Sequence, residues 1–304
     1  MKAVQLTGFG GPEVVRIGDA PVPTAGPGQL LVRAAAAGVN PVDWKIREGY
    51  MKDFFPFVFP CTLGNEMAGT VEALGEGVEG FAVGDAVFGS TGPTGSWAEL
   101  VAIDAASVAK KPASLSMAEA AALPVAVVTT AAALSAGEVG KGTRILIHAA
   151  AGGVGTIALQ MARLKGAEVT ALTSPQNMDF IRGLGAQHVV DRTSDYDKKI
   201  GDFDVVLDAY GPEAQTRSWP LLRPGGILVT LTAPPDQEAA TAHGVRATMV
   251  FGGANGAALK EAAGYAESGD LKVSIARTYA IDQAVEAMAE VQGGQVRGKV
   301  VLTI

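Results

Sequence analysis

Cysteine is nearly absent from this sequence, which has one, Cys61, among 304 residues. A single thiol cannot form an internal disulfide or a multi-cysteine zinc site, so the fold must rest on its hydrophobic core, as in proteins of reducing compartments. Histidine is also scarce, with three residues far apart in the sequence and no pair at metal-ligand spacing. We therefore expect a cytoplasmic protein without a metal site.

Basic residues are too few to give a positive surface. Lys and Arg number 24 against 31 Asp and Glu, a net charge of −7, so neither nucleic acid nor an anionic membrane is expected as a partner. The uncharged stretch 120–137 reaches the length of a membrane span, but it is mostly Ala with one Pro and two Thr, and we interpret it as a buried helix. The first ten residues have no apolar segment behind their one Lys, so a secretory signal is not expected.

Two rhythms of apolar residues divide the chain, whose length suggests two domains. Up to about Lys111, short apolar runs alternate with Gly and Pro turns, as is typical of antiparallel β structure. Beyond Gly142, apolar runs and helical stretches alternate, which predicts βαβ units and a parallel sheet. Six strands fill that sheet by Phe251, so the C-terminal segment is expected to return to the β domain. The predicted domains are residues 1–122 with 256–304, and residues 123–255, with an Ala-rich hinge helix at 116–136.

The strongest chemical signal is HAAAGGVG at 148–155, between an apolar strand and a helical stretch. The spacing of Ala150, Gly152 and Gly155 is that of the dinucleotide fingerprint G-x-G-x-x-G, with Ala in the first position. Gly152 would let a diphosphate approach the backbone, and Gly155 would allow close packing of helix on strand. Backbone amides here, including those of Gly153 and Val154, would hold the diphosphate at the helix N-terminus.

The end of the following strand bears on the choice of cofactor. It reads ALTSPQNMDF, with no carboxylate before Asp179. An acid at this point would bind the ribose 2′-hydroxyl of NAD and repel a 2′-phosphate, whereas hydroxyl and amide groups with a nearby Arg favour the phosphate. The available polar groups belong to Thr173, Ser174 and Asn177. We therefore expect NADP(H), with Arg192 favoured over Arg182 as the source of positive charge.

Six motifs occur in order along the chain: GVNPVDW at 38–44, LGNEMAGTVEALGEGV at 63–78, FAVGDAVFG at 81–89, HAAAGGVG at 148–155, LLRPGGILV at 221–229 and RGKVVL at 297–302. Together they resemble the medium-chain dehydrogenase/reductase superfamily. Within it they are similar to the zinc-independent quinone oxidoreductases, the group of zeta-crystallin and the plant enone and alkenal reductases. The resemblance covers essentially the whole chain. It implies an α/β protein with a GroES-like β-barrel catalytic domain, a Rossmann domain with a doubly wound parallel sheet, and an active-site cleft between them.

Zinc-dependent relatives bind a catalytic metal with a Cys, a His and a further Cys or Glu, and the matching positions here are Asn40, Asn65 and Ala126. These residues cannot replace a thiolate and an imidazole, and Glu66 alone does not make a site. The resemblance thus implies zinc-independent hydride transfer from NADPH to a quinone or to the C=C bond of an α,β-unsaturated carbonyl. One- and two-electron quinone reduction are not separated, and a non-catalytic, crystallin-like NADPH-binding protein is the alternative.

The resemblance also implies roles for single residues near the nicotinamide. Asn40 matches an Asn that contacts the nicotinamide ribose or carboxamide, Lys45 matches a Lys near the substrate carbonyl, and Tyr50 matches a Tyr that lines a quinone pocket. Asp43 is expected to fix the local turn and His148 to be a core residue. An apolar acceptor wall is a hypothesis for Phe54, Phe55, Phe57 and Phe59. Further cofactor contacts are expected at Thr129 or its neighbour Thr130, Leu231, Thr232, Phe251 and Lys299.

The sequence departs from the family pattern at two positions, and one predicted strand lies at the outer edge of the sheet. Arg192 stands where many relatives have Tyr, and the loop after Thr232 is short and rich in Pro. No residue is an obvious proton donor, so solvent is expected to protonate the product. The strand with Ala247 and Phe251 at its ends would be the outer edge of the sheet, and pairing with a second copy would cover it, which predicts a homodimer.

Overall fold

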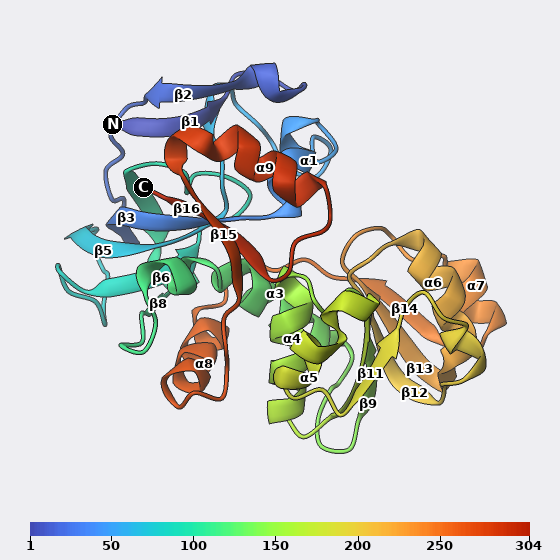
Figure 1. Ribbon diagram of the computed structural model, residues 1–304. Coiled ribbons are helices and arrows are strands. Elements are labelled where there is room, and N and C mark those ends of the chain that lie inside the picture. The colour runs from blue at the N-terminus through green and yellow to red at the C-terminus, as the bar shows by residue number, and fades with distance from the viewer. The chain divides into compact units, whose positions relative to one another are not determined.

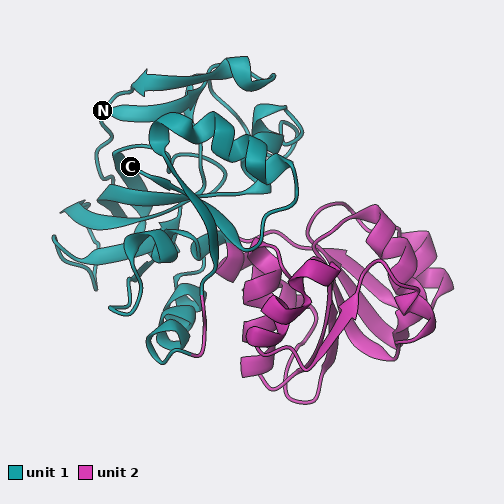
Figure 2. Cartoon of the chain, in the orientation of Figure 1, with its two compact units in different colours: residues 1–125, 254–269, 273–304 teal, residues 126–253, 270–272 magenta.

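The computed structural model describes residues 1–304 as two compact units (Figure 1, Figure 2). Unit 1 contains residues 1–125, 254–269 and 273–304, and unit 2 contains residues 126–253 and 270–272. The sequence pattern predicts residues 270–272 in the β domain. These residues cluster with unit 2 instead, where Lys272 and Gln160 exchange hydrogen bonds: Gln160 Nε2 donates to Lys272 O at 3.0 Å, and Lys272 N donates to Gln160 Oε1 at 2.8 Å.

Unit 1 consists mainly of antiparallel strands, as its short apolar runs predict. One sheet has the order β2-β1-β4, and the other has the order β15-β16-β3-β5-β6-β8 with β7 also paired to β3. The strands are β1 (Lys2–Leu6), β2 (Val15–Asp19), β3 (Gln29–Val39), β4 (Cys61–Thr62), β5 (Glu66–Leu74), β6 (Ala86–Ser90), β7 (Leu100–Asp104), β8 (Val108–Lys110), β15 (Ile275–Ala280) and β16 (Lys299–Thr303). Because β16 pairs with β3, the C-terminal segment completes the β domain that begins at the N-terminus.

The helices of unit 1 pack on the strands of these sheets, including the central strands β3 and β5 (Figure 1). They are α1 (Pro41–Arg47), α2 (Met117–Ala121), α8 (Gly256–Glu267) and α9 (Ala284–Gln292). Helix α9 packs on α1, where Arg47 Nη2 donates to Gln292 Oε1 at 3.2 Å. The core between the elements includes Leu63, Met67 and Trp97, all with 0% of their surface exposed. Burial of this apolar surface is the main force that holds β3, and the site that follows it, in place.

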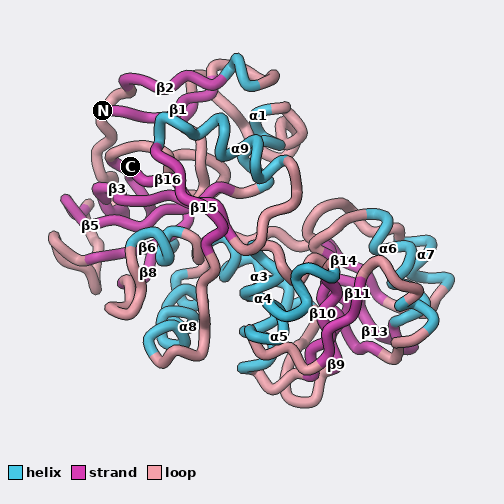
Figure 3. Tube along the Cα trace, in the orientation of Figure 1, coloured by secondary structure: helices cyan, strands magenta, loops and turns pink.

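Unit 2 is a doubly wound parallel sheet with the strand order β11-β10-β9-β12-β13-β14. Its strands are β9 (Arg144–Ile147), β10 (Glu168–Thr173), β11 (His188–Asp191), β12 (Phe203–Asp208), β13 (Leu222–Thr230) and β14 (Arg246–Met249). Helices α4 (Gly153–Leu164) and α5 (Met178–Gly183) cover one face, and α6 (Pro212–Ser218) and α7 (Gln237–Ala242) cover the other (Figure 1, Figure 3). The order reverses between β9 and β12, and ligands bind at such a point, beyond the carboxyl ends of the strands.

The Ala-rich stretch does not form the single hinge helix that we expected. Helix α2 ends at Ala121, and a separate helix, α3 (Pro124–Ala136), begins three residues later and carries the chain from unit 1 into unit 2. Proline disfavours helical geometry in the residue before it but fits the first turn of a helix. Pro124 therefore divides the stretch into two helices. None of the helices has the length and apolar character that crossing a bilayer requires.

Candidate active site

The glycine-rich turn joins β9 to α4 as the fingerprint predicts. Gly152 is the N-cap of α4, with extended backbone angles (φ −79°, ψ 177°) and no side chain to cap the helix. The first helical hydrogen bond is donated by Thr156 N to Gly152 O at 3.0 Å. The amides of Gly153, Val154 and Gly155 therefore have no acceptor within the helix. A helix N-terminus of this kind suits a diphosphate.

The two fingerprint glycines differ in their surroundings. A Cβ on Gly155 would stand 2.3 Å from Ala149 O and 2.7 Å from Ala150 Cα, so this glycine allows α4 to pack directly on the turn. A Cβ on Gly152 would meet only Ala149 O, at 3.3 Å. The space over Gly152 is thus not used by the protein itself, and the turn fits the diphosphate that the fingerprint implies.

Polar groups gather where β10 and β11 end. Thr173 is buried at the end of β10, and its carbonyl oxygen accepts from Arg192 N at 2.9 Å. The next hydroxyl, Ser174 Oγ, accepts from Asn177 Nδ2 at 3.1 Å. Arg192 is exposed, and its guanidinium stacks 5.3 Å from the ring centre of Tyr210 while Nη1 donates to the Tyr210 hydroxyl at 3.1 Å. The carboxyl ends of β10 and β11 thus carry two hydroxyls, an amide and a cation, with the guanidinium of Arg192 directed to Tyr210.

Arg182, the other candidate for the positive charge, has a different environment. Its Nη1 lies 2.6 Å from Asp179 Oδ1 in an exposed pair within α5. Its charge is therefore balanced within its own helix. Arg192 forms no ion pair and faces Tyr210 instead. Tyr210 lies in the loop after β12, and no motif in the sequence marks it.

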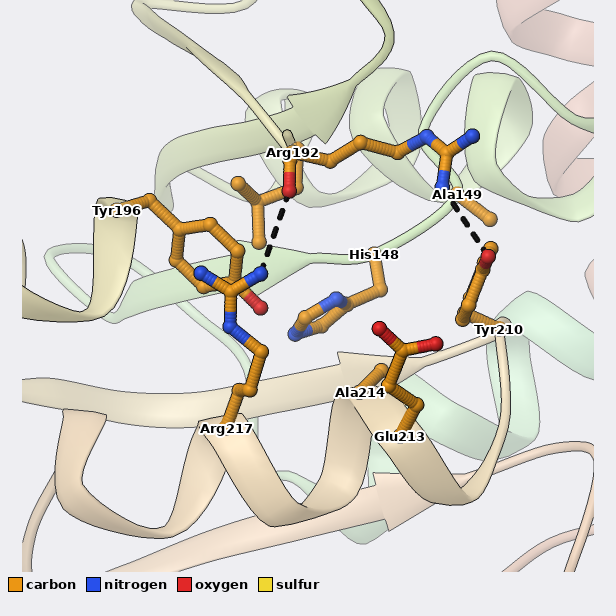
Figure 4. A pocket seen from close by; sticks show the side chains of 9 residues that line it. His148, Ala149, Arg192, Tyr196, Tyr210, Glu213, Ala214 and Arg217 are labelled. Atoms are coloured by element: carbon orange, nitrogen blue, oxygen red, sulfur yellow. Dashed lines mark hydrogen bonds between the residues drawn. The ribbon is translucent and has the colours of Figure 1, made fainter. Parts of the chain in front are cut away.

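An open hollow of about 340 Å³ adjoins the glycine-rich turn on the side of α6 (Figure 4). It is lined by His148, Ala149, Leu172, Arg192, Tyr196, Tyr210, Glu213, Ala214 and Arg217. Arg217 stacks on Tyr196 with 3.8 Å between the guanidinium carbon and the ring centre. The carboxylate of Glu213 points toward the space beside His148 (Figure 4). The hollow has flat aromatic walls and both signs of charge at the edge where the dinucleotide fold binds its ligand.

His148 is a core histidine, as expected, with 4% of its surface exposed. Burial, and then the charge of Arg217, lower its pKa from 6.5 to about 4, so it is neutral at pH 7. Ser218 Oγ donates its proton to Ala214 O at 2.6 Å and therefore accepts from His148 Nε2, which lies 2.9 Å away. This assigns the proton of the imidazole to Nε2 and leaves Nδ1 as an acceptor.

The remaining predicted cofactor residues of unit 2 lie on α3 and after β13 and β14. Thr129 is half-buried and its hydroxyl forms no hydrogen bond within the chain, while Gly252 approaches it so closely that an added Cβ would lie 2.7 Å from Oγ1. Thr130 is fully buried, and the hydroxyl oxygens of both Thr130 and Thr232 lack partners. Leu231, next to Thr232, is half-buried, and Phe251 is 50% exposed beyond β14. Buried hydroxyls without partners are costly unless a ligand satisfies them.

In unit 1, Asn40 belongs to a buried polar cluster, here called the Asn40 cluster, with Asn65, Glu66 and Lys299. Asn40 Nδ2 donates to Asn65 Oδ1 at 2.9 Å and to Glu66 Oε1 at 2.7 Å, and Asn40 Oδ1 accepts from the Lys299 ammonium. Lys299 Nζ also lies 2.6 Å from Glu66 Oε1, with side chains 6% and 0% exposed. Glu66, which alone does not make a metal site, is paired with Lys299, a residue 233 positions away along the chain.

Asp43 fixes the start of α1, as expected. Its Oδ2 accepts from Asn40 N at 2.6 Å, which caps the helix, and its Oδ1 is buried without a partner. Burial is the main cause that raises the pKa of Asp43 to about 8; the hydrogen bond from Asn40 opposes the shift, and the charge of Glu66 adds to it. The carboxyl group therefore holds its proton at pH 7.

Lys45 and Tyr50 both lie near Trp44, a residue that no sequence motif assigns a role. Lys45 Nζ is 5.8 Å from the centre of the Trp44 ring, and the Trp44 and Tyr50 rings are 6.1 Å apart in an edge-to-face arrangement. Burial lowers the pKa of Lys45, whose ammonium has no hydrogen bond within the chain. Trp44 Nε1 is buried without a partner, and Tyr50 is 63% exposed. Lys45 and Trp44 thus each have a polar group without a partner in this short segment, whereas Tyr50 is hydrogen-bonded to Glu48.

Of the four Phe residues that follow Tyr50, three pack against other aromatic rings and one is exposed. Phe57 and Phe59 pack edge-on against Phe9, with ring centres 5.7 and 4.9 Å apart, and Phe55 meets Phe57 at 6.4 Å. Phe54, in contrast, is 58% exposed. Three of the four residues proposed as an acceptor wall thus pack against other aromatic rings, and Phe54 is the exposed one.

No three His, Cys, Asp or Glu side chains in residues 1–304 are grouped so that they could hold a metal ion. Of the positions that match zinc ligands, Asn40 and Asn65 bind each other, and the Lys299 ammonium occupies a place beside them. Amide groups are poor ligands for zinc, and a fixed positive charge repels a divalent cation. The donor set of unit 1 does not fit zinc.

Two features indicate the class of protein. One is a six-stranded doubly wound sheet with a turn that suits a diphosphate, and the other is a β domain with polar groups at the end of β3. Together they are typical of two-domain dinucleotide-dependent oxidoreductases. Sequence profiles agree: "Alcohol dehydrogenase GroES-like domain" matches residues 26–113, and "Zinc-binding dehydrogenase" matches residues 184–302. The chain belongs to the medium-chain dehydrogenase/reductase superfamily, in the branch of the quinone and enone oxidoreductases.

Three relatives illustrate the similarity. A 2-methylene-furan-3-one reductase from Solanum lycopersicum is 34% identical over 99% of this chain and 79% of its own length. An NADPH-dependent alkenal/one oxidoreductase, chloroplastic, from Arabidopsis thaliana is 32% identical over the same two shares. The solved quinone oxidoreductase from Coxiella burnetii is 32% identical with a TM-score of 0.90, covering 100% of this chain and 99% of that one. The family and the fold expected from the motifs are therefore confirmed.

Proposed function

We propose that this protein is a zinc-independent, NADPH-dependent reductase that passes a hydride to a quinone or to the C=C bond of an α,β-unsaturated carbonyl. The observation that carries the proposal is the Asn40 cluster, in which amides and an ammonium replace metal ligands. Without a metal to polarise a simple carbonyl group, the acceptor must be activated by its own conjugation. The names of the tomato and Arabidopsis relatives support such acceptors.

The residues of the chain bind and orient the reactants. When bound, the reduced nicotinamide supplies the hydride. The free amides of Gly153, Val154 and Gly155 hold the diphosphate, and Asn40 orients the nicotinamide end. Lys45 matches a family Lys near the substrate carbonyl, so its ammonium would stabilise the negative charge that develops on the carbonyl oxygen. Tyr50 would donate a hydrogen bond to a flat acceptor or stack on it. Water supplies the proton, so each acceptor consumes one hydride and one proton.

In this proposal Arg192 and Ser174 favour NADPH over NADH, because a cation and a hydroxyl at the ends of β11 and β10 suit a 2′-phosphate. Arg192→Gln should raise the KM for NADPH about tenfold, the loss of one charge-assisted contact, and leave the KM for NADH unchanged. Arg182→Gln is the matched control, because Arg182 is already paired with Asp179. Equal KM changes for both cofactors in Arg192→Gln would contradict this assignment.

The activity itself is tested by the oxidation of NADPH, followed by its absorbance, with a benzoquinone, a naphthoquinone, a 2-alkenal and an alkyl enone. Turnover with one acceptor class, insensitive to a metal chelator, is the expected result. Lys45→Met should lower kcat with the preferred acceptor roughly tenfold, whereas Lys52→Met, in the exposed segment after α1, should not. No turnover with any acceptor, together with tight NADPH binding, would overturn the reductase proposal.

We also propose a homodimer in which two copies of β14 pair. This strand is the edge of the parallel sheet and pairs only with β13. An exposed edge with free backbone groups favours pairing with another strand. Sedimentation should give twice the mass of the chain, and Thr248→Lys in β14 should shift the protein towards the monomer. A monomeric wild-type protein at micromolar concentration would refute the pairing.

A further inference from the structure

The ion pair between Lys299 and Glu66 needs an explanation beyond stability. Both side chains are almost completely removed from water, at 6% and 0% exposure. Burying two charges costs about as much as their attraction returns, and apolar residues of the same size commonly stabilise a fold equally well. A buried pair of this kind is therefore weak as a device for stability and is better explained by what it orients.

The side chain that the pair orients is that of Asn40. Its Oδ1 faces the Lys299 ammonium, and its Nδ2 faces the Glu66 carboxylate at 2.7 Å. If the amide turned over, its NH₂ group would face the ammonium and its oxygen would face the carboxylate, so both contacts would become repulsive. The two charges thus select one of the two orientations of the amide.

The orientation decides what Asn40 can offer to a ligand. Both hydrogens of Nδ2 are used, one by Asn65 Oδ1 and the other by Glu66 Oε1. The oxygen has two acceptor positions, of which Lys299 fills one. Asn40 therefore presents one acceptor and no donor, and it suits a hydroxyl or an amide N–H of a ligand.

The backbone around the pair is built to hold it. A Cβ on Gly38, two residues before Asn40, would stand 2.0 Å from Glu66 Oε1, so this position of β3 has to be Gly for the carboxylate to lie there. The other carboxylate oxygen, Glu66 Oε2, accepts from Val125 N at 2.7 Å in the first turn of α3. Both oxygens of Glu66 are thus held in place. The Lys299 ammonium, which contacts both Glu66 Oε1 and Asn40 Oδ1, is the part of the cluster whose role is left to explain.

We propose that Lys299 is a positioning residue, whose ammonium locks the Asn40 amide so that it meets the nicotinamide end of the cofactor with its oxygen only. The inference rests on the proposed function, in which Asn40 contacts that end. It differs from the sequence-based expectation that Lys299 itself reaches the cofactor. Lys299 acts through Asn40, and its effect is limited to ligands that carry the nicotinamide half.

The test compares the binding of NADPH with that of 2′-phospho-ADP-ribose, which lacks the nicotinamide. Lys299→Met should weaken NADPH binding roughly tenfold, as expected for one misdirected polar contact, and should leave the Kd of the fragment unchanged. Lys299→Arg keeps the charge and should recover most of the affinity. Lys2→Met removes an ammonium from an exposed pair with Asp282 in the same unit and should change neither Kd.

A double variant separates positioning from folding. Lys299→Met alone leaves the Glu66 carboxylate buried without its cation, which lowers Tm. In Lys299→Met/Glu66→Met both charges are gone, so Tm should recover while the selective loss of NADPH affinity remains. If the double variant binds NADPH as tightly as the wild type, or if NADPH and the fragment weaken together, the positioning role is wrong. If the wild type binds neither ligand, the proposed function itself fails.

Discussion

The two glycines of the turn provide a paired prediction, because one is needed for packing and the other for the ligand. In Gly155→Ala the new Cβ would lie 2.3 Å from Ala149 O and 2.7 Å from Ala150 Cα. Both atoms belong to the backbone and cannot rotate away, so α4 must shift from the turn. Overpacking of this kind costs about 2–3 kcal/mol, and at about 3 °C per kcal/mol for a domain of this size the Tm of unit 2 should fall by roughly 6–9 °C.

In Gly152→Ala the new Cβ meets only Ala149 O, at 3.3 Å, and the φ of −79° suits any residue. The loss at this helix N-cap should be below about 1 kcal/mol, so Tm should change by no more than about 3 °C. The methyl group would, however, fill the space through which a diphosphate reaches the backbone. NADPH affinity should therefore fall tenfold or more in a variant that remains folded.

Thermal unfolding and a fluorescence titration with NADPH measure both effects on the same samples. Gly155→Ala should lose stability first and affinity as a consequence, whereas Gly152→Ala should lose affinity alone. Wild-type affinity in Gly152→Ala would refute the role of this glycine in binding diphosphate. An unchanged Tm in Gly155→Ala would refute the packing argument.

Two further predictions concern pH and have opposite signs. The pKa of His148 falls from 6.5 to about 4 on folding, so the unfolded chain binds the proton first as pH drops. The free energy of unfolding should therefore decrease between about pH 6.5 and 4. In urea titrations over this pH range, this decrease should be smaller for His148→Gln than for the wild type. The pKa of Asp43 rises from 3.8 to about 8, so its contribution is complete below about pH 4 and is lost as pH rises through about 8. Asp43→Asn, which stays neutral and still accepts from Asn40 N, should remove that decline in urea titrations at pH 5, 7 and 9; an unchanged decline would show that another group causes it.

Those parts of the fold that depend on local pattern could be predicted from the sequence. The run RILI followed by HAAAGGVG specifies strand, turn and helix within a few residues, and the structure has β9, the turn and α4 at those positions. The Ala-rich stretch was misread because composition favoured one helix, although Pro124 already marked a break. The signal that separates α2 from α3 is thus one residue, Pro124, whereas the uncharged, Ala-rich composition on both sides of it favours a continuous helix.

The partners of the Asn40 cluster could not be predicted in this way. Lys299 and Glu66 become neighbours because β16 and β5 both pair with β3, on opposite sides of it. Their contact follows from the register of three strands, and no spacing in the sequence encodes it. As a lone carboxylate Glu66 predicts no metal site, and nothing near it in the sequence indicates its ion pair with Lys299, 233 residues away.

The polar atoms left without partners indicate where a ligand contributes most to the folded protein. A buried N–H or hydroxyl without a partner costs about 1–3 kcal/mol, and Trp44 Nε1, Thr130 Oγ1 and Thr232 Oγ1 each carry this cost. Trp44 lies near Lys45 and Tyr50, and Thr232 lies two residues after the end of β13. At these two positions the chain fails to satisfy its own buried polar atoms, beside residues that the motifs assign to the reaction. Such failures are expected at functional sites, because groups that are satisfied within the chain have nothing left to offer a ligand.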